Sequence, residues 1–266
     1  MRVITTNVNG IRAAARKGGL DQLHELAPTL VCIQEVRATP LQCVELLAEA
    51  GFGEAAVVYA DCTLTPGRNG VAIVSTQPMT ASKLDLPGFA GHGRWIEMQV
   101  DTDRGPVTVI STYVPKGGDA NTLEEKRSFL KAATDRMNEL VAAGNQAIVA
   151  GDINVAHTEM DLKNWRNRVG KSGFLTWEKE FLTQWQTSGW VDVGRSLTGD
   201  QPGPYTWWSQ RGRAYDNDVG WRIDYVWATS SLAATATATH IPRAPTWDSR
   251  WSDHAPVVVD FGSSVK

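Results

Sequence analysis

Six apolar segments of the chain, each with the length of a β-strand, end in or adjoin a side chain that can bind a metal or move a proton. Asn and Asp are common in turns, so most of these residues taken alone have an ordinary structural explanation. Asp224 is harder to explain, because it stands between Ile223 and Tyr225 in an apolar segment, where a carboxylate needs a buried partner. His254 is the natural candidate. The positions are Asn7, Glu35, Tyr113, Asp152 with Asn154, Asp224, and Asp253 with His254.

These residue types suit the hydrolysis of phosphate esters with a hard divalent cation. Magnesium prefers oxygen ligands, takes one or two carboxylates and keeps several waters. Glu35 and Asp253 would supply those carboxylates. The sequence has no Cys/His cluster, which disfavours zinc. It also has no GxxxxGKS/T loop and no GxSxG motif, which argues against a nucleotide-hydrolysing switch and a serine hydrolase.

Strand-like and helix-like segments are mixed along the whole chain. Helical periodicity predicts helices at residues 19–26, 41–50, 123–143 and 176–188. Residues 160–173 and 192–205 have the composition of long loops. Because each sheet must cover one face with another sheet and the other with helices, we expect two packed sheets with helices outside. The predicted strands are residues 2–6, 30–33, 55–59, 70–75, 95–100, 107–112, 146–150, 222–228 and 256–261.

Composition narrows the class of protein. The chain has 266 residues with 26 Lys and Arg against 29 Asp and Glu, a net charge of −3. That balance argues against a broadly basic nucleic-acid coat, but DNA binding depends on the local field. The three cysteines lack CxxC spacing, which fits a reducing cytoplasm. The N-terminus does not resemble a signal peptide, and no apolar run approaches the ~18 residues of a membrane span.

Six short motifs resemble, in order, those of the exonuclease III family of abasic-site endonucleases. Any one motif is weak, but six in order from residue 1 to about 261 are specific. The wider superfamily also holds pancreatic deoxyribonuclease, neutral sphingomyelinases, inositol polyphosphate phosphatases and deadenylases, whereas residues 154–162 and 221–224 resemble the abasic endonuclease branch. The motifs are NVNGIR (7–12), IQE (33–35), YVP (113–115), GDINVAH (151–157), GWRIDY (220–225) and SDHAP (252–256).

The resemblance implies a four-layer α/β sandwich of two packed mixed β-sheets flanked by helices. It implies a single catalytic domain over residues 1–266, with the site at one edge of the two sheets. Glu35 would be the principal magnesium ligand, with Asp253 assisting and Asn7 nearby. Manganese is a plausible substitute for magnesium.

The resemblance also implies a division of catalytic labour. Asp152 would orient and deprotonate the attacking water, and Asn154 would hold that water and Asp152 in register. The same two residues could hold a second metal ion, so the number of metals stays open. Tyr113 would contact the scissile phosphate or, alternatively, act as a phenolate. His254 would bind a non-bridging phosphate oxygen, oriented by Asp224.

The implied substrate is double-stranded DNA that contains abasic sites or blocked 3′ ends. Trp207, Trp208, Trp221 and Ile223 fall where the family lines its pocket for the base-less sugar. An apolar slot suits a flipped-out deoxyribose and excludes one that still carries a base. Arg211 stands where family members place a wedge into the duplex.

Basic residues would hold the DNA backbone, although two positions depart from the family pattern. Position 9 is Asn where some members carry Asp, and Lys116 replaces a neutral amide and could contact DNA. Two acid-free segments carry four cations each and would supply phosphate contacts that do not depend on sequence. They are Arg2, Arg12, Arg16 and Lys17, and then Lys163, Arg166, Arg168 and Lys171.

Three functions are compared. The first is a magnesium-dependent DNA repair nuclease that cuts 5′ to an abasic site and leaves a 3′-hydroxyl. The second is a 3′→5′ exonuclease or 3′-end phosphatase with the same chemistry. The third, a non-catalytic DNA-binding relative, is disfavoured because the acids and His254 are all present. We expect a cytoplasmic monomer, associated with the nucleoid if the source is bacterial.

Overall fold

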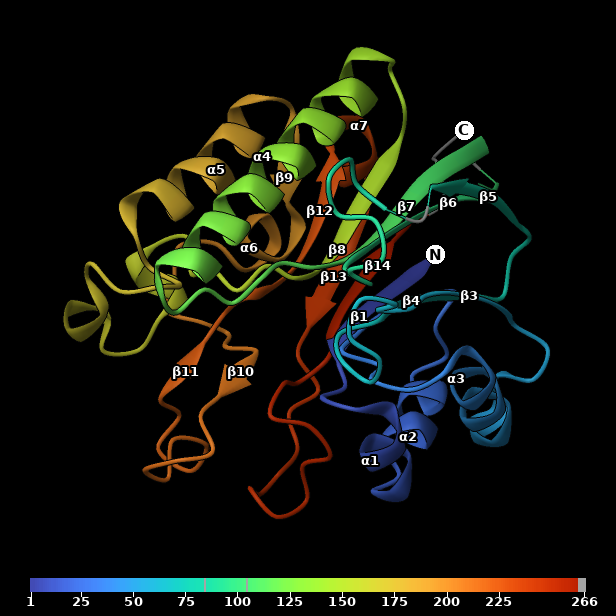
Figure 1. Ribbon diagram of the computed structural model, residues 1–266, viewed down its shortest axis with the longest axis horizontal. Coiled ribbons are helices and arrows are strands. Elements are labelled where there is room, and N and C mark those ends of the chain that lie inside the picture. The colour runs from blue at the N-terminus through green and yellow to red at the C-terminus, as the bar shows by residue number, and fades with distance from the viewer. Residues whose placement is uncertain (84, 104, 263–266) are drawn as a thin grey trace.

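Two six-stranded β-sheets pack face to face, and helices cover the outer face of each sheet (Figure 1). The computed structural model describes residues 1–83, 85–103 and 105–262. This architecture confirms the predicted four-layer α/β sandwich. Among the described residues, no helix has the length and hydropathy needed to cross a membrane.

The first sheet has the strand order β13-β14-β1-β2-β4-β3. Its central strands β1 and β2 run parallel, and every other pair in the sheet is antiparallel. The strands are β1 (Arg2–Asn7), β2 (Leu30–Gln34), β3 (Ala56–Ala60), β4 (Val71–Ser75), β13 (Ala236–His240) and β14 (Val257–Phe261).

The second sheet repeats this plan with the order β5-β6-β7-β8-β12-β9. Here β7 and β8 form the parallel central pair, and β12 lies antiparallel to β8. The strands are β5 (Met79–Lys83), β6 (Trp95–Thr102), β7 (Gly105–Tyr113), β8 (Ala147–Asp152), β9 (Trp190–Asp192) and β12 (Asp224–Thr229). A separate two-stranded ribbon pairs β10 (Trp207–Trp208) with β11 (Gly220–Trp221).

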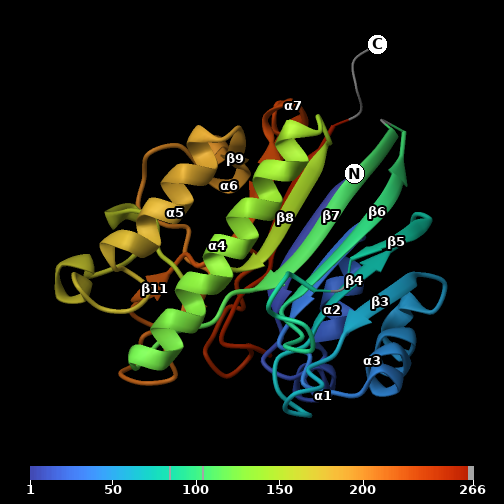
Figure 2. The same ribbon diagram turned by 45° about the horizontal axis from the view of Figure 1, so that its top comes forward.

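The helices divide between the two outer faces, as Figure 2 shows. Helices α1 (Ile11–Arg16), α2 (Gly19–Glu25) and α3 (Pro40–Leu47) cover the first sheet, and α3 runs on into a further turn at Ala48–Phe52. Helices α4 (Ala120–Ala142) and α5 (Thr176–Thr187) cover the second sheet. Two shorter helices, α6 (Val193–Thr198) and α7 (Ser230–Ala233), lie close to β12.

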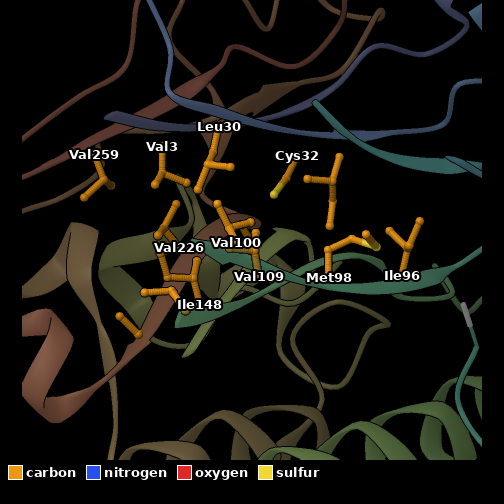
Figure 3. Packing of buried hydrophobic residues seen from close by; sticks show 14 of the residues in the cluster. Val3, Leu30, Cys32, Ile96, Met98, Val100, Val109, Ile148, Val226 and Val259 are labelled. Atoms are coloured by element: carbon orange, nitrogen blue, oxygen red, sulfur yellow. The ribbon is translucent and has the colours of Figure 1, made fainter. Parts of the chain in front are cut away.

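The core is built in three layers of apolar side chains. Between the sheets, Val3 and Leu30 face Val109 and Val226 (Figure 3). The central strands have almost continuous apolar sequences because each strand is covered on both faces, by the other sheet and by helices. The other two layers seal the helices onto the sheets, so both sheets are held rigidly at the edge where their polar residues emerge.

Several elements were not predicted. Helices α1, α6 and α7 and strands β5, β9, β10, β11 and β13 have no counterpart in the predicted set. The prediction of a loop at residues 192–205 was wrong in part, because Asp192 caps α6 by accepting a hydrogen bond from the Arg195 backbone amide at 3.1 Å. Most of these elements are too short to show a period, and β5 (MTASK) and β13 (ATATH) contain few large apolar residues, so tertiary packing rather than pattern determines them.

The two parallel pairs bring the carboxyl ends of four strands to one edge of the sandwich. Asn7 pairs with Gln34 at the ends of β1 and β2, and Tyr113 pairs with Asp152 at the ends of β7 and β8. Gly151 is required there, because a Cβ at this position would lie 1.9 Å from the carbonyl oxygen of Thr112. The fold therefore places the polar residues of both sheets side by side.

Candidate active site

A cavity of about 780 Å³ opens at this edge. Most of the residues predicted for the site line it, and they come from both sheets and from the β10–β11 ribbon. Asn7 and Asp224 lie directly beneath it, fully buried. The predicted residues on its wall are Asn9, Glu35, Tyr113, Lys116, Asp152, Asn154, Trp207, Arg211, Trp221, Ile223, Asp253 and His254.

Three of the predicted site residues occupy the left-handed region of backbone space. The φ angles are 48° for Asn9, 52° for Glu35 and 55° for Asn154. This region is uncommon for residues other than glycine, and such strain clusters at functional sites. The backbone around Glu35 is fixed by its carbonyl oxygen, which accepts a hydrogen bond from the Gly10 amide at 2.8 Å. These three residues follow the ends of β1, β2 and β8, and all three line the cavity.

Asn7 joins the two sheets at the floor of the cavity. Its Nδ2 donates to Glu35 Oε1 at 2.8 Å and to Asp152 Oδ2 at 3.0 Å. Its oxygen, the atom that a metal would bind, accepts a hydrogen bond from the Asn9 backbone amide at 2.9 Å. The structure therefore places Asn7 beside the predicted metal ligands as a donor that positions two carboxylates, and not with its oxygen toward the cavity.

Asp152 is the carboxylate with the most perturbed environment. It is 1% exposed, and Oδ1 accepts a hydrogen bond from the Asn154 backbone amide at 2.9 Å. Burial, followed by the negative charge of Asp224, raises the pKa of Asp152 to about 7. A carboxylate with this pKa suits a general base at neutral pH. Asn154 is itself anchored by its side chain, whose Nδ2 donates to the Val114 carbonyl at 3.0 Å.

Asp224 and His254 form the buried pair that the sequence predicted. His254 Nδ1 lies 2.9 Å from Asp224 Oδ2, and Asp224 Oδ2 also accepts a hydrogen bond from Thr206 Oγ1 at 2.6 Å. Burial acts to lower the pKa of His254, but the charge and hydrogen bond of Asp224 outweigh it and raise the pKa to about 10. The imidazole is therefore a cation, and its Nε2 lies 3.8 Å from Asp152 Oδ2.

The side chains of Asp152, Asp224 and His254 also form a possible metal-binding cluster. Their ligand atoms all lie within 4.8 Å of one another. Glu35 and Asp253 line the same cavity but do not belong to this cluster, so the carboxylates predicted to hold the metal are not the ones grouped most tightly. The Glu35 carboxylate instead makes an ion pair with Arg37, a residue that the sequence analysis did not select.

Asp253 accepts hydrogen bonds from two uncharged donors, and these bonds fix the orientation of its carboxylate. Oδ1 accepts from Asn9 Nδ2 at 2.9 Å, and Oδ2 accepts from Trp207 Nε1 at 3.0 Å. Burial acts to raise the pKa of Asp253, but the charge of His254 and these hydrogen bonds outweigh it, so the pKa is lowered. The amide at position 9 thus has a structural function here, because an acid there would repel Asp253.

Tyr113 is nine-tenths buried behind these carboxylates. Burial raises the pKa of the Tyr113 phenol well above its usual range, and the charges of Glu35 and Asp152 raise it further. The guanidinium of Arg94 lies 4.8 Å from the ring centroid. This environment favours a neutral phenol that donates a hydrogen bond, and it disfavours the alternative of a phenolate.

An aromatic slot forms the other half of the cavity. Trp207 and Trp221 are paired across the β10–β11 ribbon, with ring centroids 6.1 Å apart in an edge-to-face arrangement. Lys116 lies 5.5 Å above the Trp207 ring, and Arg168 lies 5.4 Å above the Trp221 ring. Arg168 was noticed only as part of a basic segment. Each aromatic wall of the slot therefore carries a cation.

Trp208 and Arg12, which were predicted to contact the abasic sugar or the DNA, do not line the cavity. Trp208 is 1% exposed, packs against Tyr215, and donates from Nε1 to Asp218 at 2.9 Å, so its inclusion in the pocket was wrong. Adjacent residues in a strand point to opposite faces, so Trp207 and Trp208 cannot both face the cavity. Arg12 does not line the cavity and is exposed on α1.

A buried ion-pair network holds the segment from the end of β11 to the start of β12, which carries Trp221, Ile223 and Asp224. Arg222 binds both oxygens of Asp192, at 3.1 and 2.7 Å, and its Nε donates to Asp161 at 2.7 Å. The Arg222 backbone amide also donates to the Asp161 carbonyl at 2.7 Å. This network fixes the aromatic slot relative to Asp224, and nothing in the local sequence pattern pointed to it.

An acidic cavity at one edge of two packed sheets, with a histidine held against a buried carboxylate, defines an α/β sandwich with the residues of a hydrolase. The chain belongs to the Endonuclease/Exonuclease/phosphatase family, whose model matches residues 4–254.

Similar proteins agree with this assignment. The chain is 31% identical to an exodeoxyribonuclease of Bacillus subtilis, over 97% of this chain and 98% of that protein. It is 28% identical to a DNA-(apurinic or apyrimidinic site) endonuclease of Dictyostelium discoideum, over 98% of this chain and 71% of that protein. Among solved structures, an AP endonuclease from Archaeoglobus fulgidus matches with a TM-score of 0.84 and 25% identity, over 98% of this chain and 99% of that one.

Proposed function

We propose that this protein is a magnesium-dependent DNA repair nuclease that hydrolyses the phosphodiester 5′ to an abasic site in double-stranded DNA and leaves a 3′-hydroxyl. The observation that carries the proposal is the position of the Trp207–Trp221 slot beside Asp152 and His254 in one cavity. The names of relatives from Bacillus subtilis and Dictyostelium discoideum support nuclease chemistry on DNA. The whole chain would act as one catalytic domain and as a monomer.

The chemistry of the donor set fits a magnesium ion. Glu35 and Asp253 line the cavity with carboxylate oxygens, and Asp152 and Asn154 add further oxygens to the same cavity. Hard cations prefer such ligands. When bound, the ion would neutralise negative charge on the phosphate oxygens. Asn7 would hold Glu35 and Asp152 in place by its two hydrogen bonds.

The residues of the chain would share the remaining work. Asp152 accepts a proton from the attacking water, whose oxygen forms the new bond to phosphorus while the bond to the 3′-oxygen breaks. The departing 3′-oxygen takes a proton from solvent and becomes the 3′-hydroxyl. The Asn154 backbone amide keeps the Asp152 carboxylate oriented. The His254 imidazolium donates a hydrogen bond to a phosphate oxygen, where charge develops, and Asp224 fixes the orientation of the ring. Tyr113 donates from its neutral phenol to the same phosphate.

The aromatic slot would select the lesion. Trp207, Trp221 and Ile223 give an apolar wall that suits a sugar without its base. Extrusion of a nucleotide costs a few kcal/mol and costs least where pairing is already lost, which favours abasic positions. Lys116, Arg168 and Arg211 would contact the flanking phosphates at the rim.

Incubation of the protein with a duplex that bears one tetrahydrofuran abasic analogue tests the proposal. We expect one cut 5′ to the analogue in the presence of magnesium and none after chelation by EDTA. The upstream fragment should be extended by a DNA polymerase, because its end is a 3′-hydroxyl. Absence of a cut with magnesium present would refute the proposal.

A second function with the same chemistry is a 3′→5′ exonuclease or 3′-end phosphatase. The name of the Bacillus subtilis relative, an exodeoxyribonuclease, favours it. Relative rates on nicked, blunt and 3′-phosphate duplexes separate the two functions. A 3′-phosphate duplex processed much faster than the abasic duplex would make this second function the main one.

A further inference from the structure

A second cavity shares a wall with the candidate active site. It measures about 240 Å³, smaller than a site for a drug-sized ligand and so suited to a single ring system. Asn9 and Asp253, joined by their 2.9 Å hydrogen bond, line both cavities and form the partition between them. The second cavity lies between α1, the loop after β10 and the loop before β14, which Figure 1 shows next to one another.

Trp247 forms one wall of this second cavity and is unusually exposed for its size, at 44%. It stands on a turn that is closed by reciprocal hydrogen bonds, from the Thr246 amide to Ser249 Oγ at 3.1 Å and from the Ser249 amide to Thr246 Oγ1 at 3.3 Å. The ring is therefore presented by a fixed turn. The described chain leaves much of it uncovered.

Arg250, which lies next to Trp247, is also held in place by hydrogen bonds. Arg250 is buried, donates to Gln210 Oε1 at 2.6 Å and to the Trp208 carbonyl at 3.3 Å, and places its guanidinium 5.5 Å from the Trp247 ring centroid. Lys17 on α1 lines the same cavity and donates to the Arg250 carbonyl at 3.5 Å. An aromatic face bounded by a lysine matches a nucleotide, because bases stack on aromatic rings and phosphates pair with cations.

We propose that this second cavity is a nucleotide subsite that takes the unpaired base opposite the lesion, stacked on Trp247 with its phosphate at Lys17. The inference rests on the proposed function. Bases within an intact duplex are already stacked and paired, so they offer no free face to Trp247. Removal of one base leaves a single base without a partner, in the strand that faces the abasic nucleotide. The shared wall of Asn9 and Asp253 places that base next to the reacting strand.

The test compares two duplexes in binding, with an Asp152→Asn background so that neither is cut. The first duplex carries a tetrahydrofuran analogue opposite adenine. The second carries a second tetrahydrofuran opposite the first, so that no unpaired base remains. With Trp247 present, we expect the first duplex to bind about 5- to 150-fold more tightly, the range for one base stacked on an aromatic ring. Fluorescence anisotropy gives both dissociation constants.

Variants at position 247 identify the residue responsible. Trp247→Ala should remove the difference between the two duplexes, and Trp247→Phe should retain most of it. Leu41→Ala, at an exposed apolar residue on α3, is the control and should change nothing.

Two results would overturn the inference in different ways. If Trp247→Ala leaves the ratio of the two dissociation constants unchanged, the subsite is refuted while the proposed function stands. If neither abasic duplex binds more tightly than an undamaged duplex, the proposed function fails first and the subsite fails with it.

Discussion

At the scale of single residues, the surroundings of Asp152 and Asp253 shift the pKa values of these two acids in opposite directions. Asp152 is buried beside Asp224, so its pKa is raised to about 7, whereas the neighbouring imidazolium and hydrogen bonds lower the pKa of Asp253. Groups whose pKa values are driven apart in this way usually divide the acid and base functions of an enzyme. The base is therefore assigned to Asp152, and Asp253 stays an ionised carboxylate.

Asp152→Asn tests this assignment. The amide keeps the shape of the side chain but cannot accept the proton, so we expect the rate of hydrolysis to fall by about 10²–10⁴-fold. The affinity for the abasic duplex should change little, since Asp152 does not carry the phosphate contacts. Single-turnover kinetics and anisotropy measure the two quantities. A variant that retains the wild-type rate would remove Asp152 from the role of base.

The pH dependence of kcat/KM should report both buried groups. Activity requires Asp152 to be deprotonated and His254 to be protonated, so it should rise through about pH 7 and fall near pH 10. Asp224 raises the pKa of both groups. Asp224→Asn should therefore move both limbs of the profile to lower pH. A profile whose alkaline limb stays in place would contradict the assignment of that limb to His254.

The acids and the histidine of the site were the residues that the sequence predicted most readily. Acids and imidazole at strand ends stand out against apolar runs, and the partner of Asp224 follows from the cost of a buried charge. Arg37 and Thr206 were not predicted, because a surface arginine and a threonine look ordinary in sequence, and Arg168 was predicted only as one cation of a basic segment. Their contacts depend on which loops meet, and local pattern does not determine that.

At the scale of elements, one buried lysine ties the catalytic loops to the helices. Lys126 on α4 donates from Nζ to the Asn154 carbonyl at 2.9 Å, to Glu178 on α5 at 2.5 Å and to the Lys116 carbonyl at 3.4 Å. Lys126 and Glu178 are both 0% exposed. The position of Asn154 and of the Lys116 loop thus depends on the packing of α4 against α5.

Substitutions at this pair separate stability from positioning. Lys126→Met leaves Glu178 as an unpaired buried charge, so we expect a loss of about 3–5 kcal/mol in the free energy of unfolding. Lys126→Met with Glu178→Leu removes both charges and should recover most of that loss. The double variant still lacks the donor to the Asn154 carbonyl, so its kcat should stay low while its KM is nearly unchanged.

Urea unfolding measures the first effect, and steady-state kinetics on the abasic duplex measure the second. A double variant with both native stability and native kcat would show that Lys126 does not position the catalytic loop.

The length of an element decided whether it could be predicted from the sequence. The central strands and the long helices α4 and α5 were predicted because their apolar patterns are long. The ribbon of β10 and β11 was not predicted, since two-residue strands carry no period, and yet it holds both walls of the aromatic slot. Short elements of this kind are specified by contacts such as Trp207 with Asp253.

At the scale of the whole molecule, the net charge of −3 conceals a division of charge between the cavity and its rim. The carboxylates gather in the cavity, and Lys116, Arg168 and Arg211 stand around it. Not every basic residue of the sequence belongs to this rim. Arg2 is paired with Asp260 at 2.8 Å, at the opposite end of β1 from Asn7.

The salt dependence of DNA binding should distinguish these two kinds of arginine. Arg168→Ala removes a cation from the rim. The slope of a plot of the logarithm of the DNA association constant against the logarithm of the salt concentration should therefore become shallower by about one. Arg2→Ala is the matched control and should leave the slope unchanged, because Arg2 is already neutralised by Asp260. Titrations at several salt concentrations give both slopes. Equal changes in the two variants would mean that the rim does not carry the phosphate contacts.

The central claim is that the cavity selects a sugar without its base and cuts the phosphodiester beside it. The most direct test is the ratio of single-turnover rates on two duplexes of the same sequence, one with an abasic analogue and one with a normal nucleotide at that position, with magnesium present. The account predicts rapid incision 5′ to the analogue and far slower internal cutting of the intact duplex. Equal rates on the two duplexes would contradict it.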